Sequence, residues 1–479
     1  MSGNRKYDPL SKFGFVEDLA ALKSNVDILS TNLPELAQRV EASEMDITSI
    51  NDTLNSGILE AQYSYGVLID NRFSSPIVTR IGNLELHKTL PVQSNMKGCL
   101  LLDDGTVNYY LNPTNWAQKA DLSASNLTGA DGQVMVEIPD YYVKYKTIDQ
   151  FQIEVRISTQ ALTGYTLKPK RYISAYKAAL QRSNSKLSSV INLTADFRGG
   201  NNNAAFDAAS NSFLGKPVSD VSLTNFRTYA RNRGNGTRWN CMTYDLRKSM
   251  YWLFVIEYAN LNPQAAVSAK DAVTGFMQGG LGNGVTTANG TEWGNFNSYR
   301  PFIPCGSSNS LGNNSGEVNY VATDFGGAGV NRTFTVNRYR GVENPFGDVW
   351  EWTDGILIDV KTDASGGTST LYTSSDPAQF TSSVLTNYTQ RGLIARTEGY
   401  IRTILFGADG DVLPINVSGG GSTTYFCDNF WRDINSNAIR GVIFGGNAAD
   451  GSNAGLVYAN ANYAPSLAFT HFGSRLCFV

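Results

Sequence analysis

Histidine and cysteine, which commonly bind metals or take part in catalysis, are scarce in this chain of 479 residues. It has two histidines, His87 and His471, and five scattered cysteines without a C-x-x-C pair. Two histidines cannot build a three-histidine metal centre, and the cysteine spacing excludes the usual zinc sites. We therefore expect buried thiols, no metal and no cofactor.

Charge and long apolar runs are also limited. Charged residues make up 17% of the chain, against roughly 25% in an average soluble domain. The net charge of −3 lacks the basic footprint that a phosphate backbone requires, so nucleic acid is not expected as a partner. The sequence contains no run of about 18 apolar residues, so membrane insertion is not expected. The first residues also lack the apolar run of a signal peptide.

Glycine, tyrosine and phenylalanine are abundant instead, with 46, 24 and 23 copies. This composition is typical of a loop-rich β or α+β protein. At roughly 150 residues per domain, the length predicts about three parts. We predict an α+β protein with an N-terminal coiled-coil stem over 1–62, a small β-rich adaptor over 63–130 and a large domain over 131–479.

A heptad pattern carries the prediction of the stem. Apolar residues occupy nearly every first and fourth heptad position for almost six heptads: Leu19, Val26, Leu33, Val40, Ile47 and Leu54, then Leu22, Leu29, Leu36, Ser43, Ile50 and Gly57. An isolated amphipathic helix rarely keeps this register for so long, so the pattern favours a coiled coil. The mixture of Leu, Val and Ile leaves the number of strands open.

Three local elements are predicted after the stem. An apolar run over 99–102, an Asp104-Gly105 turn and alternating apolar residues over 107–111 indicate a β-hairpin. The segment 223–233 is expected to form a helix that ends at Gly234. The segment 245–260 is expected to form a second helix, and because it is apolar on nearly all sides it should be buried.

The motif GVENPFGDVWEWTDG, residues 341–355, contains two tryptophans that fall on the same face of a strand. Trp350 and Trp352 should lie in the core, and Glu351 between them should point the other way as a structural acid. The strand AIRGVIF follows at 438–444, and the last strand carries Gly473 and Arg475.

These three motifs, in this order, resemble the C-type lectin fold of the formylglycine-generating-enzyme type over residues 131–479. Within that group the chain is most similar to the variable proteins of diversity-generating retroelements, in particular phage tail receptor-binding proteins. The Gly-, Asn- and Tyr-rich segment over 440–478 matches their variable region. Formylglycine-generating enzymes use a cysteine pair near the C-terminus, whereas Cys477 stands alone, so no enzyme activity is expected.

The resemblance implies a variable, solvent-facing surface that binds a host cell-surface receptor, protein or glycan. Its candidate residues are Phe444, Asn447, Ala449, Asp450, Asn460, Asn462, Tyr463, Leu467, Phe469 and His471. It also implies a place in the virion tail, attachment to other tail proteins through the N-terminus, and a homotrimer. Aromatic side chains on a rigid backbone supply contact area at small entropic cost, which suits such a surface.

Other interpretations stay open at this point. The 440–478 segment would also suit an ordinary Gly/Asn-rich loop region. A lectin-fold enzyme that acts on surface glycans is the main functional alternative, although acidic residues such as Asp348 and Glu351 are weak evidence among 42 acids. A cellular surface-display protein is a third. Asp409-Gly410-Asp411 is better explained by a turn than by calcium.

The stem prediction can be tested in the full chain with Leu22→Asp plus Leu29→Asp. Each buried leucine contributes about 1.5–3 kcal/mol, so two carboxylates in the seam should dissociate the oligomer in analytical ultracentrifugation. Ser24→Asp plus Thr31→Asp adds the same charges outside the seam and should leave the oligomer intact. A monomeric wild-type chain would contradict the stem, and an unchanged double variant would assign assembly to another part of the chain.

Overall fold

The computed structural model describes residues 18–25 and 56–479, and the chain divides into two compact units, Met1–Glu60 and Ala61–Val479. In the first unit, residues 18–25 are helical, with Leu19 and Leu22 exposed. The remaining seam residues up to Leu54 lie outside the described residues, so the coiled coil stays a prediction. A helix over 56–63 leads into the first strand. No helix in the described ranges is both long and apolar enough to cross a bilayer.

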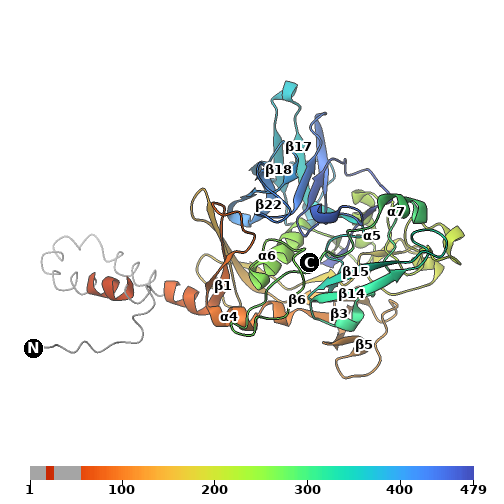
Figure 1. Cartoon of the computed structure of the whole chain (residues 1–479), viewed down its shortest axis with the longest axis horizontal. Coiled ribbons are helices and arrows are strands. Elements are labelled where there is room, and N and C mark those ends of the chain that lie inside the picture. The colour runs from red at the N-terminus through yellow and green to blue at the C-terminus, as the bar shows by residue number, and fades with distance from the viewer. Residues whose placement is uncertain (1–17, 26–55) are drawn as a thin grey trace, which may run out of the picture. The chain divides into compact units, whose positions relative to one another are not determined.

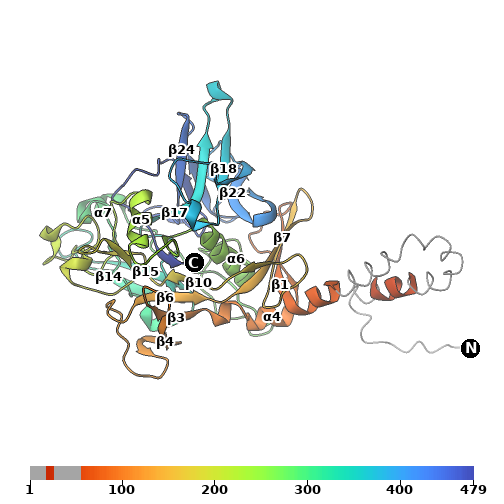
Figure 2. The ribbon, with the colours of Figure 1, turned by 180° about the vertical axis from the view of Figure 1, so that it is seen from behind.

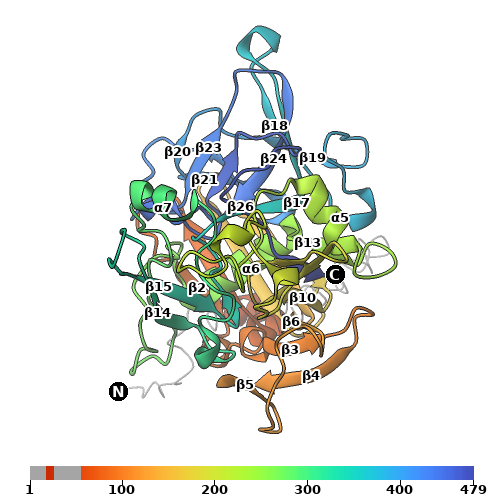
Figure 3. The ribbon, with the colours of Figure 1, turned by 90° about the vertical axis from the view of Figure 1, so that its right-hand side faces the viewer.

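The second unit is built mainly from β-sheets. The largest has eight strands in the order β19-β18-β17-β24-β25-β23-β20, with β26 beside β17. Their bounds are β17 Trp350–Val360, β18 Ser369–Thr373, β19 Thr389–Leu393, β20 Gly399–Tyr400, β23 Asn429–Arg432, β24 Ala438–Phe444, β25 Ala459–Ala461 and β26 Phe472–Gly473. In Figure 3 the connection between β17 and β18 projects at the top of this unit.

Two further sheets lie on the other side of the central helix α6. One has seven strands: β13 (Trp239–Cys241), β27 (Leu476–Phe478), β10 (Arg171–Ser174), β6 (Gln133–Ile138), β3 (Lys97–Leu101), β4 (Val107–Asn112) and β5 (Asn115–Lys119). The other has five: β2 (Thr79–Gly82), β1 (Ser64–Asp70), β8 (Gln152–Ser158), β7 (Tyr141–Thr147) and β9 (Thr166–Lys168). Figure 2 shows both below the β17 sheet.

Three small sheets complete the strand inventory of the described part. They are β14–β15–β16 (Gly316–Ala322, Arg332–Tyr339, Val342–Glu343), β11–β12 (Ala179–Gln181, Lys186–Ser188) and β21–β22 (Thr403–Phe406, Asp411–Asn416). The α-helices after residue 63 are α4 (Leu84–Thr89), α5 (Leu223–Arg231), α6 (Tyr244–Tyr258) and α7 (Gly290–Asn297).

The predicted boundary near residue 130 is not a boundary in the structure. Strand β3 from the expected adaptor pairs with β6 over five residues, and β1 pairs with β8 over seven. Residues 61–479 therefore form one unit. The Ser/Asn-rich sequence that suggested a linker is the loop between β5 and β6, and pairing between strands on its two sides is not visible in local composition.

Helix α6 lies at the centre of this unit. It packs against β17 on one side and against β1 and β8 on the other (Figure 1). The Thr243 side chain caps its first turn by accepting a hydrogen bond from the Leu246 amide at 3.4 Å. The buried helix predicted over 245–260 is confirmed, as are the helix that begins at Leu223 and the hairpin β3–β4. All five cysteines are free and buried, as expected.

The two tryptophans of the W-E-W motif are core residues, as predicted. Trp350 is 3% exposed and Trp352 is fully buried. The Trp350 ring lies 4.5 Å from the Tyr458 ring, and Trp352 makes an edge contact with Phe472 at 5.5 Å. Both tryptophans therefore cover the face of β17 that looks away from Glu351.

Glu351 points to the opposite face and is fully buried among three cations. Its Oε1 accepts hydrogen bonds from Lys177 Nζ and Arg475 Nε, both at 2.7 Å, and its Oε2 pairs with Arg247. Burial alone would raise the pKa of Glu351, but the charges of Arg475 and Lys177 outweigh it and lower the pKa to about 2. Glu351 of the W-E-W motif and Arg475 of the G-x-R motif are thus direct partners.

Trp352→Ala should cost about 3–5 kcal/mol of unfolding free energy, because truncating a buried aromatic residue leaves a cavity under Phe472. Chemical denaturation would measure this. Trp431→Ala is the matched control, since Trp431 in β23 is 40% exposed and should lose much less. Equal stabilities of the Trp352 variant and the wild-type chain would contradict the packing.

Candidate functional site

Residues 462–471 connect β25 to β26, and other elements hold their backbone. Four of their carbonyl groups accept hydrogen bonds from main-chain amides outside the segment: Tyr463 from Gly441 at 2.9 Å, Pro465 from Leu223 at 3.1 Å, Phe469 from Asp220 at 3.1 Å and His471 from Trp350 at 3.0 Å. These bonds do not depend on side chains. The segment can therefore change side chains while its path is kept.

Aromatic rings of this segment gather around a buried phenylalanine. Phe472 is fully buried, and its ring contacts those of Tyr463 (4.9 Å), Phe469 (5.0 Å) and His471 (5.0 Å). Phe472 in turn rests on Trp352. The tryptophan core thus supports the rings nearer the surface. Burial lowers the pKa of His471 to about 4, so its imidazole is neutral at physiological pH.

The ten predicted surface residues differ in exposure. Leu467 and Phe469 are 40% and 38% exposed, and Ala449 is also exposed. Five more are half-buried: Asn447, Asp450, Asn462, Tyr463 and His471. Eight of the ten thus reach the surface.

Phe444 and Asn460 do not belong to that surface, which corrects the prediction. Phe444 is fully buried, because its side of β24 faces α6, where its ring stacks on Tyr244 at 6.0 Å. Asn460 is 7% exposed, because β25 lies between β24 and β23, and its side-chain oxygen accepts a hydrogen bond from the Asn462 amide at 2.9 Å.

The side chains of Asn447 and Asp450 stabilise their own loop. Asp450 Oδ2 accepts from the Asn447 amide at 2.7 Å, and Asn447 Oδ1 accepts from the Ala449 amide at 2.8 Å. Burial raises the pKa of Asp450 to about 6 despite that bond. Burial, followed by the charge of Asp450, raises the pKa of Tyr463, so this loop lies near the 462–471 segment. Replacing either Asn447 or Asp450 would disturb the loop.

One exposed aromatic residue on the same sheet was not predicted. Trp431 on β23 lies in one row across the sheet with Asn460, Ile443 and Trp352. The alternation of buried Phe430 with exposed Trp431 could have signalled a surface tryptophan. Its neighbourhood could not be foreseen, because β23 and β25 pair in parallel across a long connection.

The two carboxylates weighed for catalysis are closed off from solvent. Glu351 and Asp348 are both fully buried, and Glu351 is enclosed by its three cations. A group with a pKa of about 2 is a poor proton donor at neutral pH. Across residues 18–25 and 56–479, no group of three or more His, Cys, Asp and Glu side chains could hold a metal ion.

No protein-family model and no curated protein matches this chain. Solved structures that match include the U1, P3c and M1 variants of a Major Tropism Determinant. Identity is 12% for U1 and 13% for P3c and M1, and 71% of this chain is covered in each case. The match covers 72%, 72% and 71% of those chains, at a TM-score of 0.22. A likeness at this level carries no argument about fold, so the C-type lectin fold stays a prediction.

A pH-dependent effect is expected at Asp348, which supports the 447–450 loop through its carbonyl, an acceptor for the Ala448 amide at 3.0 Å. Burial raises the pKa of Asp348 from 3.8 to about 7, although the charge of Lys177 opposes the shift. Folding therefore favours the protonated form, and stability falls as the pH rises from about 4 to about 7. Asn tolerates the φ of +60° at this position.

Asp348→Asn should consequently be more stable than the wild-type chain at pH 8, by about 2–4 kcal/mol. The difference should shrink toward zero at pH 4, where the wild-type carboxyl group is largely protonated. Urea unfolding at both pH values measures it. A difference that does not vary with pH would show that Asp348 titrates normally.

Proposed function

We propose that this chain is a receptor-binding protein of a phage tail that attaches the virion to host cells. The binding surface comprises Ala449, Asn462, Tyr463, Leu467, Phe469 and His471, together with Trp431, which is in register with Asn460 on the same sheet; we call it the display surface. The observation that supports it best is the combination in residues 462–471 of a backbone held by main-chain bonds with exposed large apolar side chains.

Large apolar side chains are exposed on this surface. Leu467, Phe469 and Trp431 are each about two-fifths exposed. Isolated apolar residues are common on surfaces, but aromatic and aliphatic groups gathered on a fixed backbone are typical of binding hot spots. Because Phe472 and Trp352 already support the backbone from below, the outer side chains are available for contact.

The resemblance to retroelement-diversified proteins gives this surface a biological use. We propose that its side chains vary between copies of the protein while the backbone stays fixed. Phe444 and Asn460 are excluded from the variable set by burial, and Asn447 and Asp450 are constrained by their hydrogen bonds within the loop. The variable set is thus smaller than the sequence suggests.

Assembly and location belong to the same proposal. The coiled coil over 1–62 would join three copies and connect them to other tail proteins, and the C-type lectin fold would present the display surface. The receptor is a protein or a glycan of the host surface. The protein acts by binding and not as an enzyme.

The test is Leu467→Ala plus Phe469→Ala, with adhesion of labelled full-length protein to a panel of bacterial isolates as the readout. Truncating hot-spot side chains typically costs 2 kcal/mol or more of binding free energy each. We therefore expect binding to fall at least thirtyfold. Unfolding free energy should drop by only about 1–2 kcal/mol, because both side chains are partly exposed.

Phe472→Ala serves as the structural control, since it removes the buried ring and should destabilise the chain by about 3–5 kcal/mol. If the Leu467/Phe469 double variant binds cells as well as the wild-type chain, the display surface is not the receptor site. If it unfolds like the Phe472 variant, these residues are structural. A glycan-degrading enzyme predicts instead that acidic residues in a cleft are required and that Leu467 and Phe469 are dispensable.

A further inference from the structure

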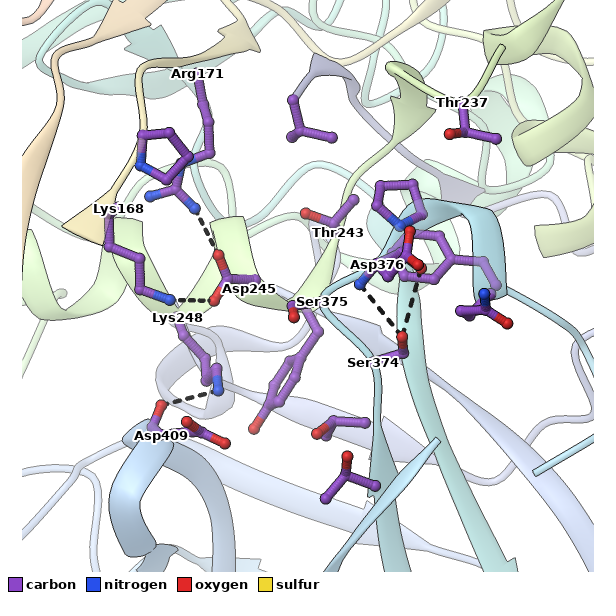
Figure 4. Close-up of a pocket in the computed structure, with 18 of the residues that line it drawn as sticks. Lys168, Arg171, Thr237, Thr243, Asp245, Lys248, Ser374, Ser375, Asp376 and Asp409 are labelled. Carbon is purple, nitrogen blue, oxygen red and sulfur yellow. Dashed lines mark hydrogen bonds and ion pairs between the residues drawn. The ribbon is translucent and has the colours of Figure 1, made fainter. Parts of the chain in front are cut away.

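A cavity of about 620 Å³ lies between the N-terminal turn of α6 and the strands β9, β18 and β19. None of the display-surface residues lines it. Figure 4 shows Lys168 and Arg171 both directed at Asp245 on one wall, with Ser374, Ser375 and Asp376 on another. Its volume is within the range of small-molecule sites, which is roughly 300–1,000 Å³.

Four of the five basic groups that line this cavity are paired with nearby acids. Asp245 accepts from Lys168 Nζ at 2.5 Å and from Arg171 Nη1 at 2.6 Å. Lys248 Nζ lies 3.0 Å from Asp411 Oδ1, and Arg391 pairs with the same carboxylate at 2.8 Å. An anionic ligand would have to compete with these carboxylates, so the cavity does not suit a phosphate or a sulfate group.

Arg391 has a second acidic partner, whereas the contacts of Arg238 are with a main-chain oxygen and an aromatic ring. Arg391 also pairs with Asp409 at 2.5 Å. Arg238 Nε donates to the main-chain oxygen of Val479 at 3.3 Å, and its guanidinium lies 4.1 Å from the centre of the Phe478 ring. These pairs present both donors and acceptors at defined positions, and nearby carboxylates offset most of the positive charge of the lining.

Hydroxyl and amide groups make up much of the remaining wall. They belong to Thr166, Thr237, Thr243, Ser374, Ser375, Thr389, Gln379 and Asn387. The two aromatic residues of the lining, Tyr244 and Phe380, are 1% and 6% exposed, so they offer little apolar area. Such a wall suits a ligand that donates and accepts many hydrogen bonds and carries no charge.

We infer that this cavity is a binding site for a small uncharged saccharide. Sugar hydroxyls both donate and accept, which matches alternating carboxylate, ammonium, guanidinium and hydroxyl groups. Hydrogen bonds between a sugar hydroxyl and a charged side chain are stronger than those between neutral groups. A sugar that left a polar group of the wall without a hydrogen bond would bind more weakly, so the wall would select sugars whose hydroxyl positions match its own groups. The rigid ion pairs reduce the entropy lost on binding.

Asp245 is ionised by its two cationic partners. Burial would raise the pKa of Asp245, but the charges of Arg171 and Lys168 outweigh it and hold the pKa well below its usual range. A carboxylate in that state cannot protonate a glycosidic oxygen at neutral pH. Asp245 is therefore unsuited to act as the general acid of a glycosidase.

Thr389→Trp is the test variant. Thr389 is an exposed strand residue of the cavity wall, and an indole there fills the cavity without removing any ion pair. Thr333→Trp is the matched control, because Thr333 is an exposed strand residue of β15 outside the cavity. Labelled full-length protein is applied to a printed array of neutral, sialylated and phosphorylated oligosaccharides. Titration calorimetry follows with the strongest neutral one.

We expect wild-type chain to bind neutral oligosaccharides, Thr389→Trp to bind at least tenfold more weakly, and Thr333→Trp to stay within twofold. The Leu467/Phe469 double variant should retain this binding, which separates this site from the display surface. Binding that survives in Thr389→Trp, a preference for anionic glycans, or no binding to any neutral glycan would each overturn the inference.

A second variant covers the case in which Thr389→Trp does not fold. Asp376→Asn removes one exposed carboxylate of the wall, and an Asn side chain can still cap the short 3₁₀ turn Pro377–Gln379 by accepting from the Ala378 amide. Calorimetry should show at least a threefold loss of affinity with an unchanged melting temperature. Unchanged affinity in this variant would overturn the inference.

Discussion

The buried carboxylate of Glu351 and its three cations are the interaction on which the rest of this structure depends. Lys177, Arg247 and Arg475 come from three distant parts of the chain and meet on one side of β17. Removing one partner of such a buried group usually costs several kcal/mol, because the remaining charges stay desolvated. The cluster therefore fixes how α6, β17 and the approach to β27 sit together. With Glu351 held on the inner face, strand alternation sends Trp350 and Trp352 to the outer face, where they support the display surface.

The sequence revealed the elements whose signals are local. The W-E-W spacing predicts which side chains share a face. The first helix follows from its terminating glycine, the second from an apolar run on nearly all sides, and the β3–β4 hairpin from its Asp-Gly turn. Pairing between distant strands could not be derived in this way. The boundary expected near residue 130 is wrong because β1 and β3 pair with β8 and β6, and loop composition does not report on such partners.

The candidate surface could be predicted only in part, because local sequence does not show which distant segments cover a strand. A resemblance indicates which segment varies, but exposure depends on what covers each face of the sheet. The resemblance places Phe444 on the surface, whereas its side of β24 faces α6, and it does not indicate Trp431, which lies in register with Asn460. The hydrogen bonds that hold the 462–471 backbone join it to Asp220, Leu223, Trp350 and Gly441. These partners cannot be predicted from the residues of the segment itself.

The two proposed sites differ in how freely their residues can change. The side chains of the display surface project from a backbone whose main-chain bonds are independent of side-chain identity, so substitution there leaves the fold in place. Asp245, Lys248 and Arg391 in the cavity wall each take part in ion pairs that join different elements, so substitution there costs stability. A protein with both sites would hold its recognition of a saccharide constant while its display surface changes. Adhesion could then begin on a common surface sugar, and the display surface would decide which host is retained.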